Sequence, residues 1–308
     1  MQDVLIEQAL MRVAMLAPGL SELLETVSHG LLEFYHNPQT WQVSRKQDQS
    51  LLTDADLWAH QQLVAGLTGL SPDIPVMSEE TAARDVQRFC VQPPQMYWLI
   101  DPLDGTRGFV SRSGEFAINV ALIVQTQAIA GWIAWPCTGW LCWAYGHRRF
   151  TQGQRHFVVR NMSPLPFGSL FDSLSSSSAQ ESLEAVVLSS SEGTARHLPV
   201  IDVFRDCFEI VHIHNLGAAT KFCAMALGYG NFYPRLAGTC LWDLAAGQVL
   251  LNGLGGDIFD LTGQSLRYDF SKGTLNPHFL AVRDQQHPQL QPLLAQLNHL
   301  SQHPSWSH

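Results

Sequence analysis

The sequence is poor in positive charge. It contains 18 Lys and Arg residues against 27 Asp and Glu, which gives a formal net charge of -9, and it has no long basic run. Proteins that bind nucleic acid polymers through their phosphates usually carry a basic patch or stripe. The composition therefore argues against a nucleic acid polymer as partner, while a small anion held through metal ions is compatible with it.

The sequence also lacks a Cys-x-x-Cys pair, a signal peptide and an obvious membrane span. Its six cysteines are scattered, and 308 residues need no disulfide staples, so we expect reduced thiols and a cytoplasmic location. The first residues, MQDVLIEQALMRVAML, place Asp3 and Glu7 inside the apolar region, which favours a helix over a signal peptide. No apolar run approaches the length of a membrane span, so we expect no stable membrane insertion. The oligomeric state stays open.

What the chain has is enough apolar sequence for a sizeable core. Hydrophobic residues make up 46% of it and charged residues 15%, and its length allows two modest domains. Residues 163–182 are rich in Ser, Pro and Gly, which predicts a loop at a domain boundary. We expect an N-terminal α+β domain over residues 1–165 and a C-terminal α/β domain over residues 183–308.

Apolar spacing predicts the main elements. Residues 3–35 have helical periodicity interrupted by Pro18 and Gly30, which predicts two helices; a further helix over 53–70 could be capped by Thr53 or Asp54. Three β-rich runs then predict an antiparallel meander, strands and helices alternate after residue 183, and a polar helix follows residue 285. The runs of the meander are 116–124, 128–136 and 139–145; the later strands are 185–189, 209–214, 232–236 and 278–282, and the helices 219–227 and 243–252.

Four acids stand at strand ends or helix starts: Glu79, Asp101, Asp104 and Asp243. Such positions can converge at one edge of a layered α/β core. Carboxylate oxygens suit Mg²⁺, and two such ions can clamp the attacking and leaving oxygens of a phosphoryl transfer. The acids therefore predict a magnesium site with phosphatase chemistry.

The turn Asp101-Pro102-Leu103-Asp104-Gly105-Thr106 is the centre of this pattern. Pro102 stiffens the turn between the two carboxylates, and Gly105 and Thr106 can present backbone N–H groups to a phosphate. Taken alone, an Asp-Pro-x-Asp-Gly segment is compatible with a capped turn and nothing more.

Three motifs occur in order along the chain: Ser78-Glu79-Glu80, Asp101-Pro102-Leu103-Asp104-Gly105-Thr106 and Trp242-Asp243-Leu244-Ala245-Ala246-Gly247. Together they resemble the signature of the inositol monophosphatase superfamily of metal-dependent phosphatases, over about residues 46–281. The resemblance implies a layered αβαβα sandwich of the inositol monophosphatase and fructose-1,6-bisphosphatase type, with the active site between the two halves.

Within that superfamily the sequence is most similar to the CysQ-type 3′(2′),5′-bisphosphate nucleotidases. This similarity implies hydrolysis of 3′-phosphoadenosine 5′-phosphate to AMP and phosphate by a metal-activated water, lithium sensitivity and a role in sulfur assimilation. The segments that carry it are Asp73-Ile74-Pro75-Val76-Met77-Ser78-Glu79-Glu80, Gly114-Glu115-Phe116, Lys221-Phe222-Cys223, Tyr233-Pro234-Arg235-Leu236 and Asn276-Pro277-His278-Phe279.

The resemblance also implies roles for individual residues. One Mg²⁺ would be held by Glu79, Asp101 and the carbonyl of Leu103, and a second by Asp101, Asp104 and Asp243, with two or three ions in total. Thr106, backed by Asp56, would orient the attacking water, and Glu79 would support catalysis. The substrate would be bound by Gly105, Thr106, Lys221, Arg235 and Asp243.

The sequence departs from the nucleotidase pattern near the expected nucleotide. Ser190 and Glu192 stand where a cation and a histidine are usual, Ala218 replaces a serine, and Gly108 replaces an acid. The same metal chemistry on inositol monophosphate or a sugar bisphosphate is therefore an alternative, which a side-by-side assay of the substrates would separate. A nucleotide-sensing protein without turnover is the alternative of another class, and tight nucleotide binding without phosphate release would favour it.

Overall fold

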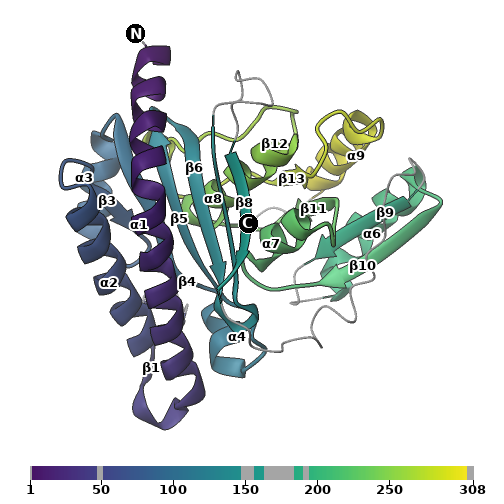
Figure 1. Cartoon of the computed structure of the whole chain (residues 1–308). Helices are drawn as coiled ribbons and strands as arrows, with labels where there is room; N and C mark the ends of the chain where they lie inside the picture. Colours follow the sequence, from purple (N-terminus) through teal and green to yellow (C-terminus); the bar gives the residue numbers. More distant parts are fainter. Residues whose placement is uncertain (1, 47–50, 147–155, 163–183, 190–193, 304–308) are drawn as a thin grey trace.

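A computed structural model describes residues 2–46, 51–146, 156–162, 184–189 and 194–303. Its helices and strands form five layers in the order α/β/α/β/α, in which two sheets are separated by a central helical layer (Figure 1). The predicted layered α/β sandwich is therefore confirmed. The predicted loop over 163–182 lies outside the described residues, so the division into domains at 1–165 and 183–308 stays a prediction.

The first sheet has six strands in the order β3-β4-β5-β6-β7-β8. All neighbours are antiparallel except β3, which pairs parallel with β4, so the predicted meander is confirmed as β5, β6 and β7. Every residue of β5 is buried, because helices cover both faces of the sheet. The strands are β3 (Val76–Ser78), β4 (Met96–Asp104), β5 (Ala117–Val124), β6 (Gln127–Trp135), β7 (Trp140–Tyr145) and β8 (His156–Asn161).

One long helix, α1 (Gln2–His36), covers the outer face of this sheet together with α2 (Asp54–Leu70). The prediction of two helices was wrong, because Pro18 lies inside α1 on its exposed side. Gly30 is also no break: a Cβ there would lie 1.9 Å from the Trp58 ring, so glycine lets the two helices approach closely. The buried stripe continues through both positions, as Ile6, Ala9, Val13, Ala17, Leu20, Leu24, Val27, Leu31 and Tyr35.

Helix α1 also bears on the membrane question. By length and composition it is the one helix in the described part of the chain that could cross a membrane, so the expectation that no segment reaches that length was wrong. Its buried stripe belongs to the main hydrophobic core and packs against α2, β5 and β6. This packing is that of an amphipathic helix that covers one face of a sheet with a single apolar stripe.

The predicted cap of α2 is confirmed. Thr53 is its N-cap, and Thr53 and Asp56 form a reciprocal capping box in which Asp56 also accepts the Thr53 N–H at 2.7 Å. The short strands β1 (Val43–Arg45) and β2 (Leu51–Thr53) pair ahead of this helix. The cap fixes Asp56 at the start of α2 with 2% of its surface exposed.

The central layer consists of α7 (Thr220–Leu227) and α8 (Leu241–Leu254). Helix α8 packs on β4 to β8 of the first sheet and on β12 (Asp257–Asp260) of the second. Gly131 on β6 makes this approach possible, because a Cβ there would lie 2.7 Å from the Ala246 carbonyl oxygen. The close contact sets the position of the first turn of α8, which carries Asp243.

The second sheet has the strand order β10-β9-β11-β13-β12 and rests on a smaller core beneath α6 (Thr194–Cys207) and α9 (Leu290–Ser301). The strands predicted after residue 183 and the helix after 285 are confirmed; α6, α3 (Ala83–Val91), β8 and β12 were not predicted. The other elements are β9 (Glu184–Ser189), β10 (Ile210–Asn215), β11 (Phe232–Arg235), β13 (Phe279–Val282), α4 (Thr106–Ser111), η1 (Pro38–Thr40), η2 (Pro136–Thr138) and η4 (Phe270–Lys272).

The six cysteines all lie in the described part of the chain, and all are free thiols, as expected.

Candidate active site

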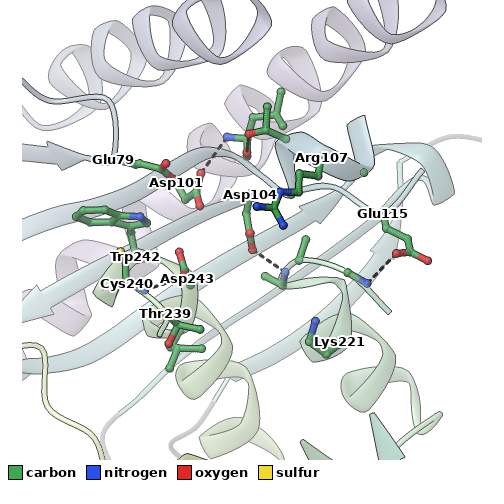
Figure 2. Close-up of a pocket in the computed structure, with 18 of the residues that line it drawn as sticks. Glu79, Asp101, Asp104, Arg107, Glu115, Lys221, Thr239, Cys240, Trp242 and Asp243 are labelled. Atoms are coloured by element: carbon green, nitrogen blue, oxygen red, sulfur yellow. Dashed lines mark hydrogen bonds between the residues drawn. The ribbon is translucent and has the colours of Figure 1, made fainter. Parts of the chain in front are cut away.

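A cavity of about 780 Å³ opens where the two halves of the chain meet. Its walls come from β4 and α4 of the first half and from α7, β11 and α8 of the second (Figure 2). The residues predicted as site residues that line it are Glu79, Asp101, Leu103, Asp104, Gly105, Thr106, Lys221, Arg235 and Asp243. Asp56, the remaining predicted site residue, does not line the cavity.

Strand β4 delivers two of the acids. Its apolar run is buried, and the pairing with β5 shifts register between Asp101 and Asp104, so the chain bulges there and turns both carboxylates toward the cavity. Asp101 is 2% exposed, and its Oδ1 accepts the Leu103 N–H at 3.1 Å. The Pro102 turn therefore holds the first carboxylate with its own backbone.

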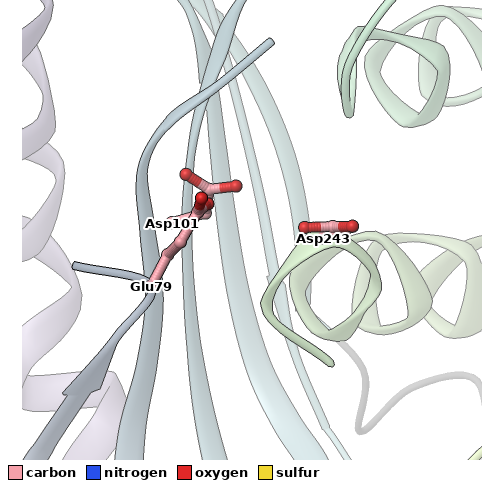
Figure 3. A group of neighbouring side chains, drawn as sticks. All are labelled: Glu79, Asp101 and Asp243. Carbon is pink, nitrogen blue, oxygen red and sulfur yellow. The ribbon is translucent and has the colours of Figure 1, made fainter. Parts of the chain in front are cut away.

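Three carboxylates from separate elements converge beside this bulge. Glu79 follows β3, Asp101 is on β4, and Asp243 lies across from them on the first turn of α8 (Figure 3). One carboxylate oxygen of each lies within 4.8 Å of one oxygen of the other two. The sequence prediction that these acids meet is thus confirmed for Glu79, Asp101 and Asp243.

The three carboxylates repel one another when all are ionised. Burial raises the pKa of Asp101 and Asp243 well above the usual range, and the neighbouring acids raise both further. A divalent cation among these oxygens would relieve that cost. The charge pattern therefore fits a cation site.

Asp104 lies on the same cavity wall but outside this tight group. Its Oδ2 accepts the Ala219 N–H at 2.6 Å and the Asn119 amide at 3.2 Å. Burial raises its pKa, while the nearby Lys221 ammonium opposes that rise. The backbone before α7 and a side chain from β5 thus fix one oxygen of Asp104.

Thr106 and Asp56 form a hydrogen-bonded pair. The Thr106 hydroxyl donates to Asp56 Oδ1 at 3.0 Å and lies 3.3 Å from the Leu103 carbonyl oxygen. Burial raises the pKa of Asp56, and hydrogen bonds from Thr53 and Thr106 oppose the rise. Gly105 precedes this pair with φ +89°, and a Cβ there would lie 2.6 Å from the Glu115 carbonyl oxygen, so the turn requires glycine.

Three basic side chains line the cavity: Arg107, Lys221 and Arg235. Lys221 is 2% exposed; its ammonium donates to the Leu216 carbonyl at 2.8 Å and lies 4.8 Å from the Tyr233 ring centroid. Burial, together with the nearby Arg235, lowers the pKa of Lys221 to about 7. The Nε atom of Arg235 is buried and has no hydrogen-bond partner within the described residues.

Sequence reasoning missed two residues that organise the acids. The Lys46 ammonium lies 2.7 Å from both Glu79 Oε1 and Glu80 Oε1. Asn119 holds Asp104, and its signal was a single amide inside the otherwise apolar run of β5. Of the departures noted above, Ser190 and Glu192 lie outside the described residues; Ala218 lines the cavity with φ +53°.

Comparisons with known proteins agree with this geometry. The sequence is 31% identical over 264 residues to the 3′(2′),5′-bisphosphate nucleotidase CysQ of Salmonella typhimurium, covering 84% of this chain and 96% of the relative. The corresponding protein of Escherichia coli K12 is 30% identical over the same coverage. A crystal structure of CysQ from Bacteroides thetaiotaomicron, a bacterial member of the inositol monophosphatase family, superposes with a TM-score of 0.67 at 26% identity, over 86% of this chain and 96% of that one.

More distant structures share the fold alone. One is an IMPase/NADP phosphatase complexed with Mg²⁺ and phosphate, at 16% identity and a TM-score of 0.67, over 94% of this chain and 96% of that one. The inositol monophosphatase family profile matches residues 15–302, which include every acid of the cavity. The chain belongs to the inositol monophosphatase family.

Proposed function

We propose that the protein is a Mg²⁺-dependent 3′(2′),5′-bisphosphate nucleotidase that hydrolyses 3′-phosphoadenosine 5′-phosphate to AMP and phosphate in the cytoplasm. The convergence of Glu79, Asp101 and Asp243 in a cavity also lined by Thr106, Lys221 and Arg235 carries this proposal. The nucleotidase relatives support the choice of substrate. Sulfur assimilation is the expected setting.

The donor set fits magnesium. All the candidate ligands are oxygens, and hard cations such as Mg²⁺ prefer carboxylates and carbonyls, with substrate phosphate completing the shell. Glu79, Asp101 and the Leu103 carbonyl would hold one ion, and Asp101, Asp104 and Asp243 a second. When bound, such ions make water more acidic and neutralise charge on the phosphate.

The chain itself would position the nucleophile. Because the Thr106 hydroxyl donates its proton to Asp56, its oxygen can accept a hydrogen bond from the attacking water. The water then attacks phosphorus in line, the bond between phosphorus and the ribose oxygen breaks, and AMP and phosphate leave with the two hydrogens of water distributed between them. Asp56 acts through Thr106 and is a positioning residue.

Lys221 and Arg235 would select the bisphosphate. Both side chains line the same cavity as the acids. The buried Nε of Arg235 has no hydrogen-bond partner within the described residues and is available to donate to a ligand oxygen. Charge-assisted hydrogen bonds from guanidinium and ammonium groups are the usual means of binding a phosphate. Gly105 and the backbone of Thr106 would face the phosphate that is cleaved.

The test is phosphate release from 3′-phosphoadenosine 5′-phosphate, inositol 1-phosphate and fructose 1,6-bisphosphate, each with Mg²⁺ and with or without lithium. We expect a clear, lithium-sensitive preference for the nucleotide. Preference for inositol phosphate or the sugar bisphosphate would show that the same site acts on that substrate instead. Tight binding of the nucleotide without phosphate release would replace catalysis by sensing.

A further inference from the structure

We propose that Glu115 is a positioning residue for this reaction: it fixes the turn at residues 216–219, and through that turn it holds the carboxylate of Asp104. The inference rests on the proposed function, because Asp104 matters as a ligand only there. Glu115 follows α4 in the first half of the chain, whereas the turn precedes α7 in the second. No role in the chemistry itself is assigned to Glu115.

The first step is a hydrogen bond across the cavity wall. The Gly217 N–H donates to Glu115 Oε2 at 2.9 Å, although the two residues are 102 positions apart in the sequence (Figure 2). Two residues further on, the Ala219 N–H donates to Asp104 Oδ2 at 2.6 Å. Two carboxylates of the first half therefore hold one short segment of the second.

The second step is the shape around Glu115. A Cβ on Gly217 would lie 2.9 Å from Glu115 Oε2, and a Cβ on Gly105 would lie 2.6 Å from the Glu115 carbonyl oxygen. The backbone at Gly105 and at Gly217 thus approaches Glu115 so closely that a side chain at either position would clash with it. Glu115 therefore lies where the turn at Gly105 meets the turn before α7.

The third step is the conformation of the turn itself. Ala218 has φ +53°, in the left-handed region that a residue with a Cβ adopts only when its surroundings hold it. Several hydrogen bonds hold the turn. The Gly217 N–H donates to Glu115, the Ala219 N–H donates to Asp104, and the Lys221 ammonium donates to the Leu216 carbonyl at 2.8 Å. The Leu216 N–H also donates to the Ser189 carbonyl, and the Thr220 hydroxyl to the Gly217 carbonyl. Without Glu115, the turn would lose the hydrogen bond at Gly217, two residues before the N–H that holds Asp104.

Two conservative variants separate position from charge. Glu115→Gln keeps the side-chain length and an acceptor oxygen but removes the charge. Glu115→Asp keeps the charge but shortens the side chain by one methylene, so it cannot reach Gly217. Ser111→Ala, another cavity-lining change, is the matched control.

The measurements are calorimetric titration with Mg²⁺ alone and steady-state kinetics on the bisphosphate, with circular dichroism melting to confirm folding. Loss of a residue that orients a metal ligand costs about tenfold to a hundredfold in metal affinity or activity. We expect Glu115→Asp to weaken Mg²⁺ binding and lower kcat by at least about tenfold, with KM changed less, and Glu115→Gln and Ser111→Ala to stay close to the parent protein.

Parent-like Mg²⁺ binding and kcat in Glu115→Asp would overturn the proposal. So would equal losses in Glu115→Gln and Glu115→Asp, because Glu115→Gln retains the length and an acceptor oxygen for the Gly217 N–H, and its loss would show that this hydrogen bond does not set the Mg²⁺ affinity. If the parent protein binds Mg²⁺ but releases no phosphate from the bisphosphate, the proposed function fails, while the Mg²⁺ titrations of the two variants still decide the role of Glu115.

Discussion

The hydroxyl of Thr106 and the carboxylate of Asp56 are joined by a hydrogen bond of 3.0 Å. Asp56 uses its other oxygen, Oδ2, to cap α2 by accepting the Thr53 N–H. Asp243 repeats the arrangement on α8, where its Oδ2 accepts the Cys240 N–H at 2.7 Å. Both acids therefore occupy the third helical position of a capping box and are oriented by the helix that they cap.

Thr106→Val tests the hydroxyl of the first pair. Valine matches threonine in shape, so the substitution removes the hydrogen bond to Asp56 and leaves the packing of α4 nearly unchanged. We expect kcat for the bisphosphate to fall by about 10²–10⁴-fold, the range that proton-transfer and orienting groups contribute. Thr106→Ser, which retains the hydroxyl, should keep most of the activity in the same phosphate-release assay. Equal activity of the Val and Ser variants would remove Thr106 from the mechanism.

Asp104→Asn tests the second magnesium position. The amide oxygen of asparagine can still accept the Ala219 N–H, so the turn before α7 should keep its place and the fold should be intact. The ligand charge is lost, and we expect turnover to fall by about a hundredfold or more. Phosphate release, with circular dichroism as the check on folding, measures this. Near-parent turnover would contradict the assignment of Asp104 as a ligand.

Mg²⁺ should stabilise the protein, and more strongly at higher pH. Asp101 and Asp243 have raised pKa values in the fold, so the stability that they contribute is present below their unfolded pKa of about 3.9 and is lost as pH rises through the folded value. In EDTA the carboxylate cluster should therefore lower the free energy of unfolding most near neutral pH and above. Mg²⁺ at about a hundred times its Kd adds about 2.7 kcal/mol, or about 4 °C in Tm for a chain of this size.

The control for the magnesium effect is Asp101→Asn, which removes one like charge from the cluster. In EDTA this variant should melt above the parent protein, and its Mg²⁺-induced shift should be much smaller. Thermal melts at about pH 6 and about pH 8 give both quantities. A Mg²⁺ shift of the same size in Asp101→Asn would show that the ion binds elsewhere.

Arg235→Ala tests recognition of the second phosphate. The guanidinium lines the cavity and its Nε is buried, so its loss removes a charge-assisted contact of about 1.5–3 kcal/mol. We expect KM for 3′-phosphoadenosine 5′-phosphate to rise about tenfold to a hundredfold. KM for a simple phosphate monoester should change little. Equal effects on the two substrates would show that Arg235 does not recognise the second phosphate.

Much of the architecture could be predicted because its signals are local. The N-cap at Thr53, one of the two candidates, and the alternation of short β-rich runs with breaks depend on neighbouring residues alone, and both are confirmed. The acids at element ends were likewise visible, and the cluster of Glu79, Asp101 and Asp243 follows from the ends of their elements meeting at the cavity.

The errors arose where tertiary contacts outweigh local preference. Pro18 costs α1 a backbone hydrogen bond, about 3 kcal/mol in a helix interior, but the stripe of buried residues on both sides of it holds the helix together. Gly30 looked like a helix break, but the glycine is needed there because the Trp58 ring on α2 leaves no room for a Cβ. Glu115 carries no local sign of its partner, because Gly217 lies 102 residues away.

The close approach of α8 to the six-stranded sheet predicts that adding a side chain at Gly131 lowers the stability of the protein. A Cβ on Gly131 would meet the Ala246 backbone, with 2.7 Å to the carbonyl oxygen and 2.8 Å to Cα, and neither backbone atom can move without shifting α8. Overpacking of this kind costs about 1–3 kcal/mol, so Gly131→Ala should lower Tm by several degrees. Because α8 carries Asp243, the variant should also bind Mg²⁺ more weakly.

Gly69 is the matched control, since it lies in α2 and a Cβ there would meet no atom within 4 Å. Replacing a helical glycine by alanine removes conformational freedom from the unfolded chain and gains about 0.5–1 kcal/mol. Gly69→Ala should therefore raise Tm slightly and leave Mg²⁺ binding unchanged. If both variants melt above the parent protein, α8 does not pack on β6 as closely as its contact with Gly131 requires, and the position of Asp243 would depend on the cap at Cys240 instead.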